Sequence, residues 1–175
     1  EPVFENYGTT TIGDIAIAPS NPEIVWAGTG EANIFRSSNA GCGVYKTEDG
    51  GESWSHMGLE NTYTISRIIV HPENSEIVFV ATAGHEWTHN KERGLFKTLD
   101  GGKNWTQIKY IDEETGFNDL VMHPENSDIL YATSWQRTRL KWNDPRTYAD
   151  HKNNSVWKSM DGGESWVKMD KGLPK

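Results

Sequence analysis

The sequence predicts an all-β fold in which one four-stranded unit occurs three times. A nine-residue string is repeated as KTEDGGESW at 46–54, KTLDGGKNW at 97–105 and KSMDGGESW at 158–166. A second string precedes each copy and begins at Asp14, Arg67 and Asp119. The chain of 175 residues also contains 17 glycines and 8 tryptophans, which indicates many turns and a recurring packing role for the indole ring.

The second string supplies the first two strands of each unit. It reads DIAIAPSNPEIVWAGTG in the first unit, RIIVHPENSEIVFVATAG in the second and DLVMHPENSDILYATSW in the third. In each, apolar runs rich in β-branched and aromatic residues flank a turn that contains proline and asparagine, which is typical of strands. The runs IIV, IVFV and ILYA are almost continuous, so we expect strands that are buried on both faces.

Each unit is therefore expected to contain a strand, a turn, a strand, a variable loop, a strand, an Asp-Gly turn and a final strand. Four short antiparallel strands in about 40 to 50 residues form one blade of a β-propeller. We expect blade 1 at about 12–58, blade 2 at about 64–110 and blade 3 at about 117–170. Together they predict a partial β-propeller over 1–175.

The repeated Asp-Gly-Gly string is expected to be structural. Each aspartate can accept backbone N–H bonds within its own turn, and the glycines supply the positive φ angles that a tight turn needs. Calcium ligation or catalysis is the alternative, but a chemistry that recurs three times favours a turn lock because an active site is normally single. We expect a tryptophan after each turn to pack on the sheet; the pairs are Asp49 and Trp54, Asp100 and Trp105, and Asp161 and Trp166.

The pattern [S/T]-x-D-G-G-x-[S/N]-W resembles the Asp-box, or BNR, repeat, and the three copies cover the whole chain. This repeat occurs in sialidases, xyloglucan-cleaving hydrolases, a chloroplast photosystem assembly factor and the sortilin-type receptor domain. The strings GTGEAN, GVYKTEDGGESW, SRIIVHP, ERGLFKTLDGGKNW and NDLVMHP are most similar to secreted bacterial proteins with sortilin-like BNR propellers. The resemblance implies a fold and a secreted, periplasmic or cell-surface location, whereas one fold serves many functions.

The number of blades raises a question of closure. Propellers usually have four to eight blades, so three blades leave two open sheet faces. We therefore expect either a fragment of a larger propeller, completed by further blades of a longer chain, or several copies that assemble. The sequence begins EPVFENYG and shows no signal peptide, which agrees with a mature form or a fragment.

The charge balance narrows the choice of partners. The net charge is −8, from 25 acidic and 17 basic residues, so a basic face for nucleic acid or an anionic membrane is not expected. No apolar run reaches the length of a membrane span. The single cysteine, Cys42, cannot form an internal disulfide. GTGEAN is not followed by a helical pattern and is no phosphate loop, and we expect no cofactor.

Two groups of residues are candidates for a ligand site, because in a propeller the innermost strand starts on the face to which the loop between the second and third strands returns. The first group, expected to form part of a charged ring, is Asp14, Arg67 and Asp119, with mutual ion pairing as the alternative. The second group lies in the three loops: Glu31, Asn33, Phe35 and Arg36; His85, Glu86, Trp87, His89 and Arg93; and Trp135, Arg137, Arg139, Trp142, Asp144, Arg146, Tyr148 and His151. Long loops are often functional, and aromatic and arginine side chains anchor interfaces and stack on sugars. A loop that only packs over its neighbours is the alternative.

The string HEWTH, from His85 to His89, fits the zinc-binding HExxH pattern. That site needs a helix, which places both histidines on one face. Here the string directly follows an apolar strand and ends just before the next one, GLFKT, and blades 1 and 3 show nothing similar. We therefore expect no metal site, with incidental metal binding by the two histidines left open.

Binding of a protein, peptide or glycan is the predicted function. Glycoside hydrolysis, sialidase-like or glucanase-like, is the alternative, and it needs two carboxylates across the sugar. The carboxylates on the expected face are Asp14, Glu31, Glu86, Asp119 and Asp144. A sialidase would need three arginines and a Tyr–Glu pair. Although six arginines are present in these regions, FRSS at 35–38 does not match the sialidase arginine motif and no Tyr–Glu pair is marked.

Overall fold

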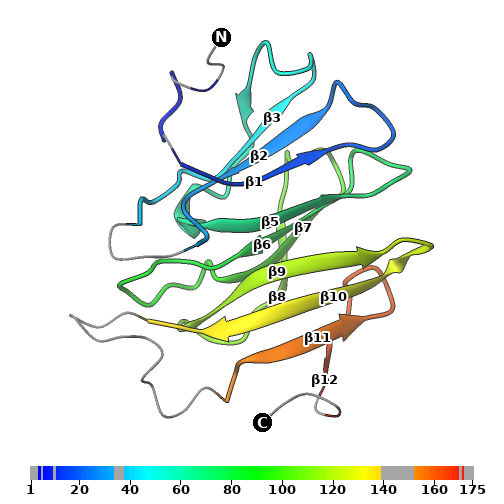
Figure 1. Cartoon of the computed structure of the whole chain (residues 1–175). Helices are drawn as coiled ribbons and strands as arrows, with labels where there is room; N and C mark the ends of the chain where they lie inside the picture. Colours follow the sequence, from blue (N-terminus) through cyan, green and yellow to red (C-terminus); the bar gives the residue numbers. More distant parts are fainter. Residues whose placement is uncertain are drawn as a thin grey trace.

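The fold consists of three four-stranded antiparallel sheets that follow one another along the chain (Figure 1). In the computed structural model, residues 4, 6–9, 11–33, 38–138, 152–169 and 171 are described. Within these residues the only helix is a short 3-10 turn, η1 (Glu60–Thr62), between the first two sheets. The predicted all-β fold, with three blades of four strands, is confirmed.

Each sheet is a meander whose strands pair in chain order. Blade 1 contains β1 (Ile12–Ile17), β2 (Val25–Thr29), β3 (Val44–Thr47) and β4 (Ser55–His56). Blade 2 contains β5 (Ile65–Val70), β6 (Val78–Thr82), β7 (Gly94–Thr98) and β8 (Thr106–Lys109). Blade 3 contains β9 (Thr115–His123), β10 (Asn126–Gln136), β11 (Ser155–Ser159) and β12 (Val167–Met169). The innermost strands β1, β5 and β9 lie next to one another across the blades.

Two hydrophobic cores hold the blades together, one at each seam. Between blades 1 and 2, Trp26 and Val44 pack against Ile68, Val78 and other aliphatic residues of blade 2. A second core between blades 2 and 3 contains Phe79, Ala81, Leu95, Phe117, Leu120, Leu130 and Ala132. Because every sheet uses one face for each neighbour, strand β6 of the middle blade is buried along its whole length. In blades 1 and 3, a neighbouring blade covers only one of the two sheet faces.

Besides the pairing of the second and third strands, one hydrogen bond between the two repeated strings recurs in every blade. The first glycine of the Asp-Gly-Gly turn donates its N–H to a carbonyl in the turn between the first two strands or, in blade 3, near the start of β10, at 3.0 Å in all three blades. The donor and acceptor residues are Gly50 and Glu23, Gly101 and Glu76, and Gly162 and Asp128. These turns therefore lie at the opposite end of each sheet from the loops between the second and third strands. In Figure 1 the described parts of those loops lie on the left of the view.

The aspartates hold the Asp-Gly-Gly turns in the same way three times. Asp100 accepts bonds from the backbone N–H and side-chain amide of Asn104, at 2.9 and 2.7 Å, and from the Thr98 hydroxyl at 2.8 Å. Asp49 and Asp161 make the matching bonds to Ser53 and Thr47 and to Ser165 and Ser159. Since these donors favour the charged carboxylate, they lower the pKa of all three aspartates, to about 2 for Asp100 and Asp161.

The tryptophans that follow the turns occupy different surroundings. Trp105 lies against the first core, where its ring meets Trp26 edge-on with centroids 6.1 Å apart, and its indole donates to the Met57 carbonyl at 2.7 Å. Trp166 packs against the second core. Trp54 instead lies at the free face of blade 1, where its ring meets that of Phe4. Of the residues that the structure describes, none belongs to a helix long and apolar enough to cross a membrane.

Candidate functional site

The loops between the second and third strands form the loop face, which contains the predicted site residues. The loops span 30–43, 83–93 and 137–154. Several predicted residues lie outside the described residues: Phe35, Arg36, Arg139, Trp142, Asp144, Arg146, Tyr148 and His151. Glu31 lies at the rim of the first loop, where its carboxylate accepts the Asn39 N–H at 3.3 Å, and Asn33 is exposed.

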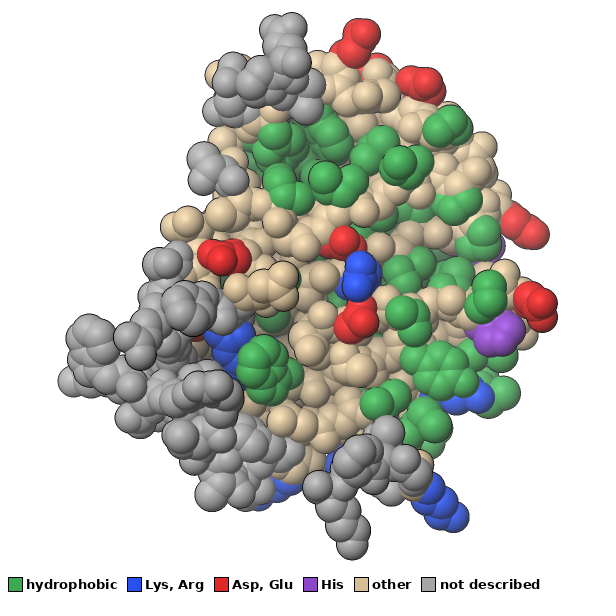
Figure 2. All heavy atoms as spheres, in the orientation of Figure 1, with side chains coloured by type: hydrophobic (Ala, Val, Ile, Leu, Met, Phe, Trp, Pro, Cys, Tyr) green, Lys and Arg blue, Asp and Glu red, His purple; other side chains and the backbone are tan. Residues whose placement is uncertain are grey.

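The innermost strands bring Asp14, Arg67 and Asp119 together. The Arg67 guanidinium donates through Nε to Asp119 at 2.8 Å, and its Nη1 lies 3.5 Å from the Asp14 carboxylate. Near the centre of the view in Figure 2, one basic side chain lies between two acidic ones. Asp14 also accepts the Ile68 N–H at 2.7 Å. The hydrogen bond that Arg67 donates to Asp119 and the charges of both carboxylates raise the pKa of Arg67, so the three side chains neutralise one another in part.

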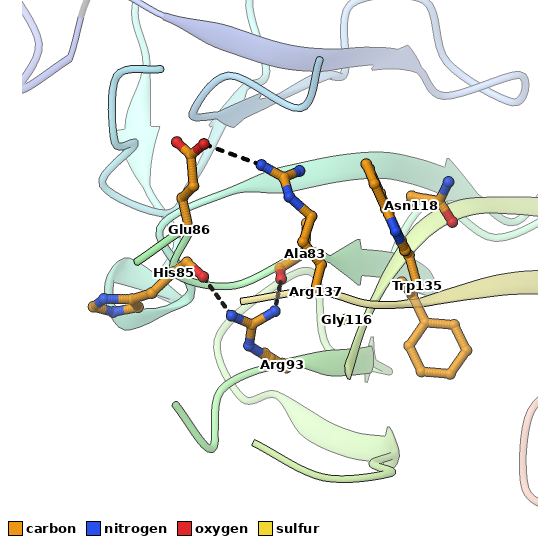
Figure 3. Close-up of a pocket in the computed structure, with 9 residues that line it drawn as sticks. Ala83, His85, Glu86, Arg93, Gly116, Asn118, Trp135 and Arg137 are labelled. Carbon is orange, nitrogen blue, oxygen red and sulfur yellow. Dashed lines mark hydrogen bonds and ion pairs between the residues drawn. The ribbon is translucent and has the colours of Figure 1, made fainter. Parts of the chain in front are cut away.

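A second charged pair is buried beneath the loops. Arg137, just after β10, contacts Glu86 of the 83–93 loop at 3.2 Å, and both side chains are almost fully buried. The Arg137 guanidinium also lies over the Trp135 ring, 4.6 Å from its centroid. These residues line a pocket of about 10 Å³, shown in Figure 3, which has room for at most one water molecule. The pair therefore joins blades 2 and 3 and does not itself form a ligand cavity.

Arg93 determines the path of the 83–93 loop. Its buried guanidinium donates to the carbonyl oxygens of Ala83, His85, Thr88 and Glu114 and to the side chain of Asn90 (Figure 3). Burial, and then repulsion from Arg137, lower the pKa of Arg93 to about 10, so it remains charged at neutral pH. The one cation thus connects three carbonyl groups of the loop with the Glu114 carbonyl of the connection between β8 and β9. The sequence showed Arg93 only as one of several loop arginines.

The HEWTH string is part of this loop and forms no helix. The His85 ring stacks on Tyr63 with centroids 3.4 Å apart, whereas His89 contacts the Glu114 carboxylate at 3.0 Å. Within the described residues, no group of three or more histidine, cysteine, aspartate or glutamate side chains is placed to hold a metal ion. The two histidines thus face different partners, because the loop lacks the helical turn that would align them.

A cleft of about 240 Å³ opens where the loops of blades 1 and 2 meet. Three segments line it, namely 38–40 of the first loop, Tyr63 and Thr64 of the connection between the blades, and 85–88 of the second loop. Tyr63, Thr64 and Asn39 were not among the predicted site residues. No motif marks them, because they become neighbours only when blade 1 packs on blade 2.

Comparisons with known proteins agree with the repeat. The model of the Sortilin-Vps10 family (Sortilin, neurotensin receptor 3) matches residues 42–175. A curated relative, the photosystem II assembly lipoprotein Ycf48 of Synechococcus sp. (strain CC9902), is 25% identical over 124 residues, which are 70% of this chain and 29% of that protein. The chain thus spans less than a third of this relative.

Solved structures confirm the propeller architecture. An ancestral GH74 enzyme has 19% sequence identity and a TM-score of 0.64 over 90% of this chain and 18% of its own. A structure of Ycf48 bound to D1 peptide has 13% identity and a TM-score of 0.52 over 90% of this chain and 39% of its own. At these identities the likeness concerns the fold alone. Because the family model covers most of the sequence and the three Asp-box blades are present, the chain belongs to the Sortilin-Vps10 family.

Proposed function

We propose that this chain is a ligand-binding module of an Asp-box propeller protein and that it binds a protein, peptide or glycan through the loop face. The cleft at the seam between blades 1 and 2 is the observation that carries the proposal. It combines half-exposed aromatic rings with hydroxyl and amide groups, which is the mixture found in ligand sites. The Arg93 clamp supports the proposal because a preorganised loop loses little entropy on binding.

The state of the carboxylates favours binding over hydrolysis. A glycoside hydrolase needs one carboxyl group that donates a proton and a second that attacks the sugar or activates water. Among the described candidate carboxylates, Asp14 and Asp119 contact Arg67, Glu86 contacts Arg137, and Glu31 accepts the Asn39 N–H. The arginine that already contacts Asp14, Asp119 or Glu86 would have to be displaced before that carboxylate could engage a sugar. Hydrolysis, suggested by the GH74 fold neighbour, is therefore the weaker candidate.

The location belongs to the same proposal. The curated relative is named a lipoprotein, which supports a secreted, periplasmic or cell-surface position for this chain as well. Ycf48 has been solved with a peptide, which supports a peptide or protein among the ligands to be screened. Fractionation of the source cells, with detection of the protein by antibody, tests the location. Recovery in the cytoplasm alone would contradict it.

The test of function is a binding screen with paired variants. The chain is immobilised and exposed to an array of glycans and a library of peptides, and hits are repeated with Trp87→Ala and Leu99→Ala. Both side chains are exposed, but Trp87 lies on the loop face and Leu99 lies in an Asp-box turn at the opposite end. We expect Trp87→Ala to weaken binding and Leu99→Ala to leave it unchanged. The reverse pattern, or no binding to either array, would overturn the proposal, and release of reducing sugar from a glycan hit would establish hydrolysis.

A further inference from the structure

The cleft between blades 1 and 2 has the dimensions of a site for one ring. Its volume of about 240 Å³ is just below the roughly 300–1,000 Å³ that is usual for sites of drug-sized ligands. Its walls are two loops and the connection between the blades, rather than the edge of a strand. An extended peptide, which commonly binds by adding a strand to a sheet edge, finds no such edge among these lining segments. The shape therefore favours a compact, cyclic group.

The aromatic residues of the cleft are held in place by the backbone. Tyr63 follows η1 and has a φ of 61° and a ψ of −34°, a positive-φ conformation that is rare for a bulky residue. Its carbonyl accepts the Gly41 N–H at 2.7 Å, and Thr64 accepts the Ala83 N–H at 3.0 Å, so the connection is bonded to both loops. Its ring contacts the His85 ring at a tilt of 35°, and the residue is 39% exposed, while Trp87 is 48% exposed. The cleft thus presents flat apolar surfaces on a fixed frame.

The remaining lining groups are polar but carry little net charge. Ser38, Asn39, Thr64 and Thr88 contribute hydroxyl and amide groups, and Thr88 bonds to His85 at 3.1 Å. Burial, and then the charge of Arg93, lower the pKa of His85, so its imidazole is neutral at pH 7. The charge of Glu86 is balanced by Arg137. The net charge of −8 disfavours a strongly anionic ligand. A cationic ligand is not favoured either, because the Glu86 carboxylate in the cleft is already paired with Arg137.

We propose that this cleft binds a single neutral sugar ring, such as one hexose unit of an uncharged glycan. A pyranose has one flat face of C–H groups, which packs on an aromatic ring, and a rim of hydroxyl groups, which matches the amide and hydroxyl side chains of the lining. The inference rests on the proposed ligand-binding function and names the ligand class for that site. Tyr63 and Trp87 supply the stacking surfaces, and Asn39 and Thr88 supply hydrogen bonds at the rim.

Titration calorimetry with defined probes tests the inference. The probes are cellotetraose, maltotetraose and mannotetraose as neutral glycans, tetragalacturonate as an anionic glycan, and the peptide hits of the screen above. We expect at least one neutral tetrasaccharide to bind and tetragalacturonate not to bind. Trp87→Ala and Tyr63→Asn are each expected to weaken the binding about tenfold. Asparagine is chosen at position 63 because it tolerates a positive φ better than other residues.

Two control variants separate stacking from folding. Tyr110→Asn removes a ring that is also 39% exposed but does not line the cleft, and it is expected to bind like the unaltered chain. Trp87→Phe keeps an aromatic face and is expected to retain most of the affinity. Saturation-transfer NMR should show the strongest signals from the C–H protons of one sugar ring. Thermal unfolding of each variant shows whether the fold has been kept.

The possible results also separate this inference from the proposed function. Loop-face binding of peptides without binding of the neutral tetrasaccharides overturns the sugar assignment and leaves the binding function in place. The assignment is also overturned if neutral glycans bind but Trp87→Ala and Tyr63→Asn bind them as tightly as Tyr110→Asn does. A chain that binds no member of any panel overturns both.

Discussion

Equivalent residues are buried at the seams between blades and exposed at the two ends of the row of blades. Ile15, Ile68 and Leu120 each follow the charged residue of their innermost strand. Ile68 and Leu120 face the preceding blade and are 3% and 1% exposed, whereas Ile15, which no blade precedes within the described structure, is 60% exposed. At the other end, Val121 and Val167 of blade 3 are exposed. Each blade therefore has apolar residues for packing against two neighbouring blades, and within the described structure each outer blade has one neighbour.

The two end faces are covered differently. At blade 1, the rings of Phe4 and Tyr7 pack on Tyr45, and Phe4 also reaches Trp54, so part of the face is shielded. At blade 3, a cleft of about 510 Å³ lined by Lys158, Met160, Val167 and other residues is open to solvent. Lys158 corresponds to Lys97, which crosses the seam to the Gly162 carbonyl and Glu164 of the next blade, both at 2.9 Å. This face has the features of a seam without the adjoining blade, as the prediction of a partial propeller requires.

The largest expected effect concerns the tryptophans of the Asp-box turns. Trp105→Ala should lower the free energy of unfolding by about 3–5 kcal/mol, because it empties part of the first seam and leaves the Met57 carbonyl without its donor. Trp54→Ala, at the end face, should cost clearly less. Urea unfolding followed by circular dichroism measures both. Equal losses for the two variants would contradict the contrast between seam and end.

The isoleucines of the innermost strands give a contrast without aromatic rings. Ile68→Ala should lower the free energy of unfolding by about 2–4 kcal/mol, because it removes a buried side chain from the first core. Ile15→Ala should change it by no more than about 0.5 kcal/mol, as is usual for exposed positions. The same unfolding measurement applies. A comparable loss at Ile15 would show that another surface covers blade 1 in solution.

Substitution of the second glycine in two of the turns distinguishes the effect of packing from that of backbone strain. Gly51 and Gly102 have similar φ angles, 102° and 90°, so alanine is strained equally at both. A Cβ at Gly102 would lie 2.7 Å from the ring of Trp26 across the seam, whereas at Gly51 the nearest atom is 4.0 Å away. Gly102→Ala should therefore be less stable than Gly51→Ala by about 1–3 kcal/mol. Equal melting temperatures for the two variants would show that the Trp26 ring shifts at little cost to make room for the added methyl group.

The smallest effect should be the same in all three blades, because the Asp-box bonds lie within one turn. The folded pKa of Asp100 and of Asp161 is about 2, below that of an unfolded aspartate, so each contributes stability that is present above about pH 4. This contribution is lost as the pH falls from about 4 to about 2. Stability measured against pH should show this decline, and Asp100→Asn should reduce it. A decline that does not change in the variant would assign it to other carboxylates.

At the loop face, the sequence predicted which segments lie there but not all of the contacts between them. The loops, the charged ring and the buried Glu86 and Arg137 lie in segments that the repeat indicated, because the order of strands within a blade determines which end of a sheet each loop occupies. The pairing of Arg67 with two aspartates agrees with the ion-pairing alternative. The role of Arg93 and the position of Tyr63 in the cleft could not be predicted, because both depend on contacts with segments far away in the chain or on a rare backbone angle.

Elements that depend on neighbours a few residues apart could be predicted from the sequence. The Asp-Gly-Gly turns close through bonds between residues two and four apart, and the strands follow from runs of β-branched residues, so both repeat wherever the string repeats. The tertiary structure decided what depends on the presence of an adjoining blade. Burial of an isoleucine requires an opposing surface, and a cleft requires two loops from different blades. For this reason identical positions are core at the seams and surface at the ends, and the candidate site lies where two blades meet.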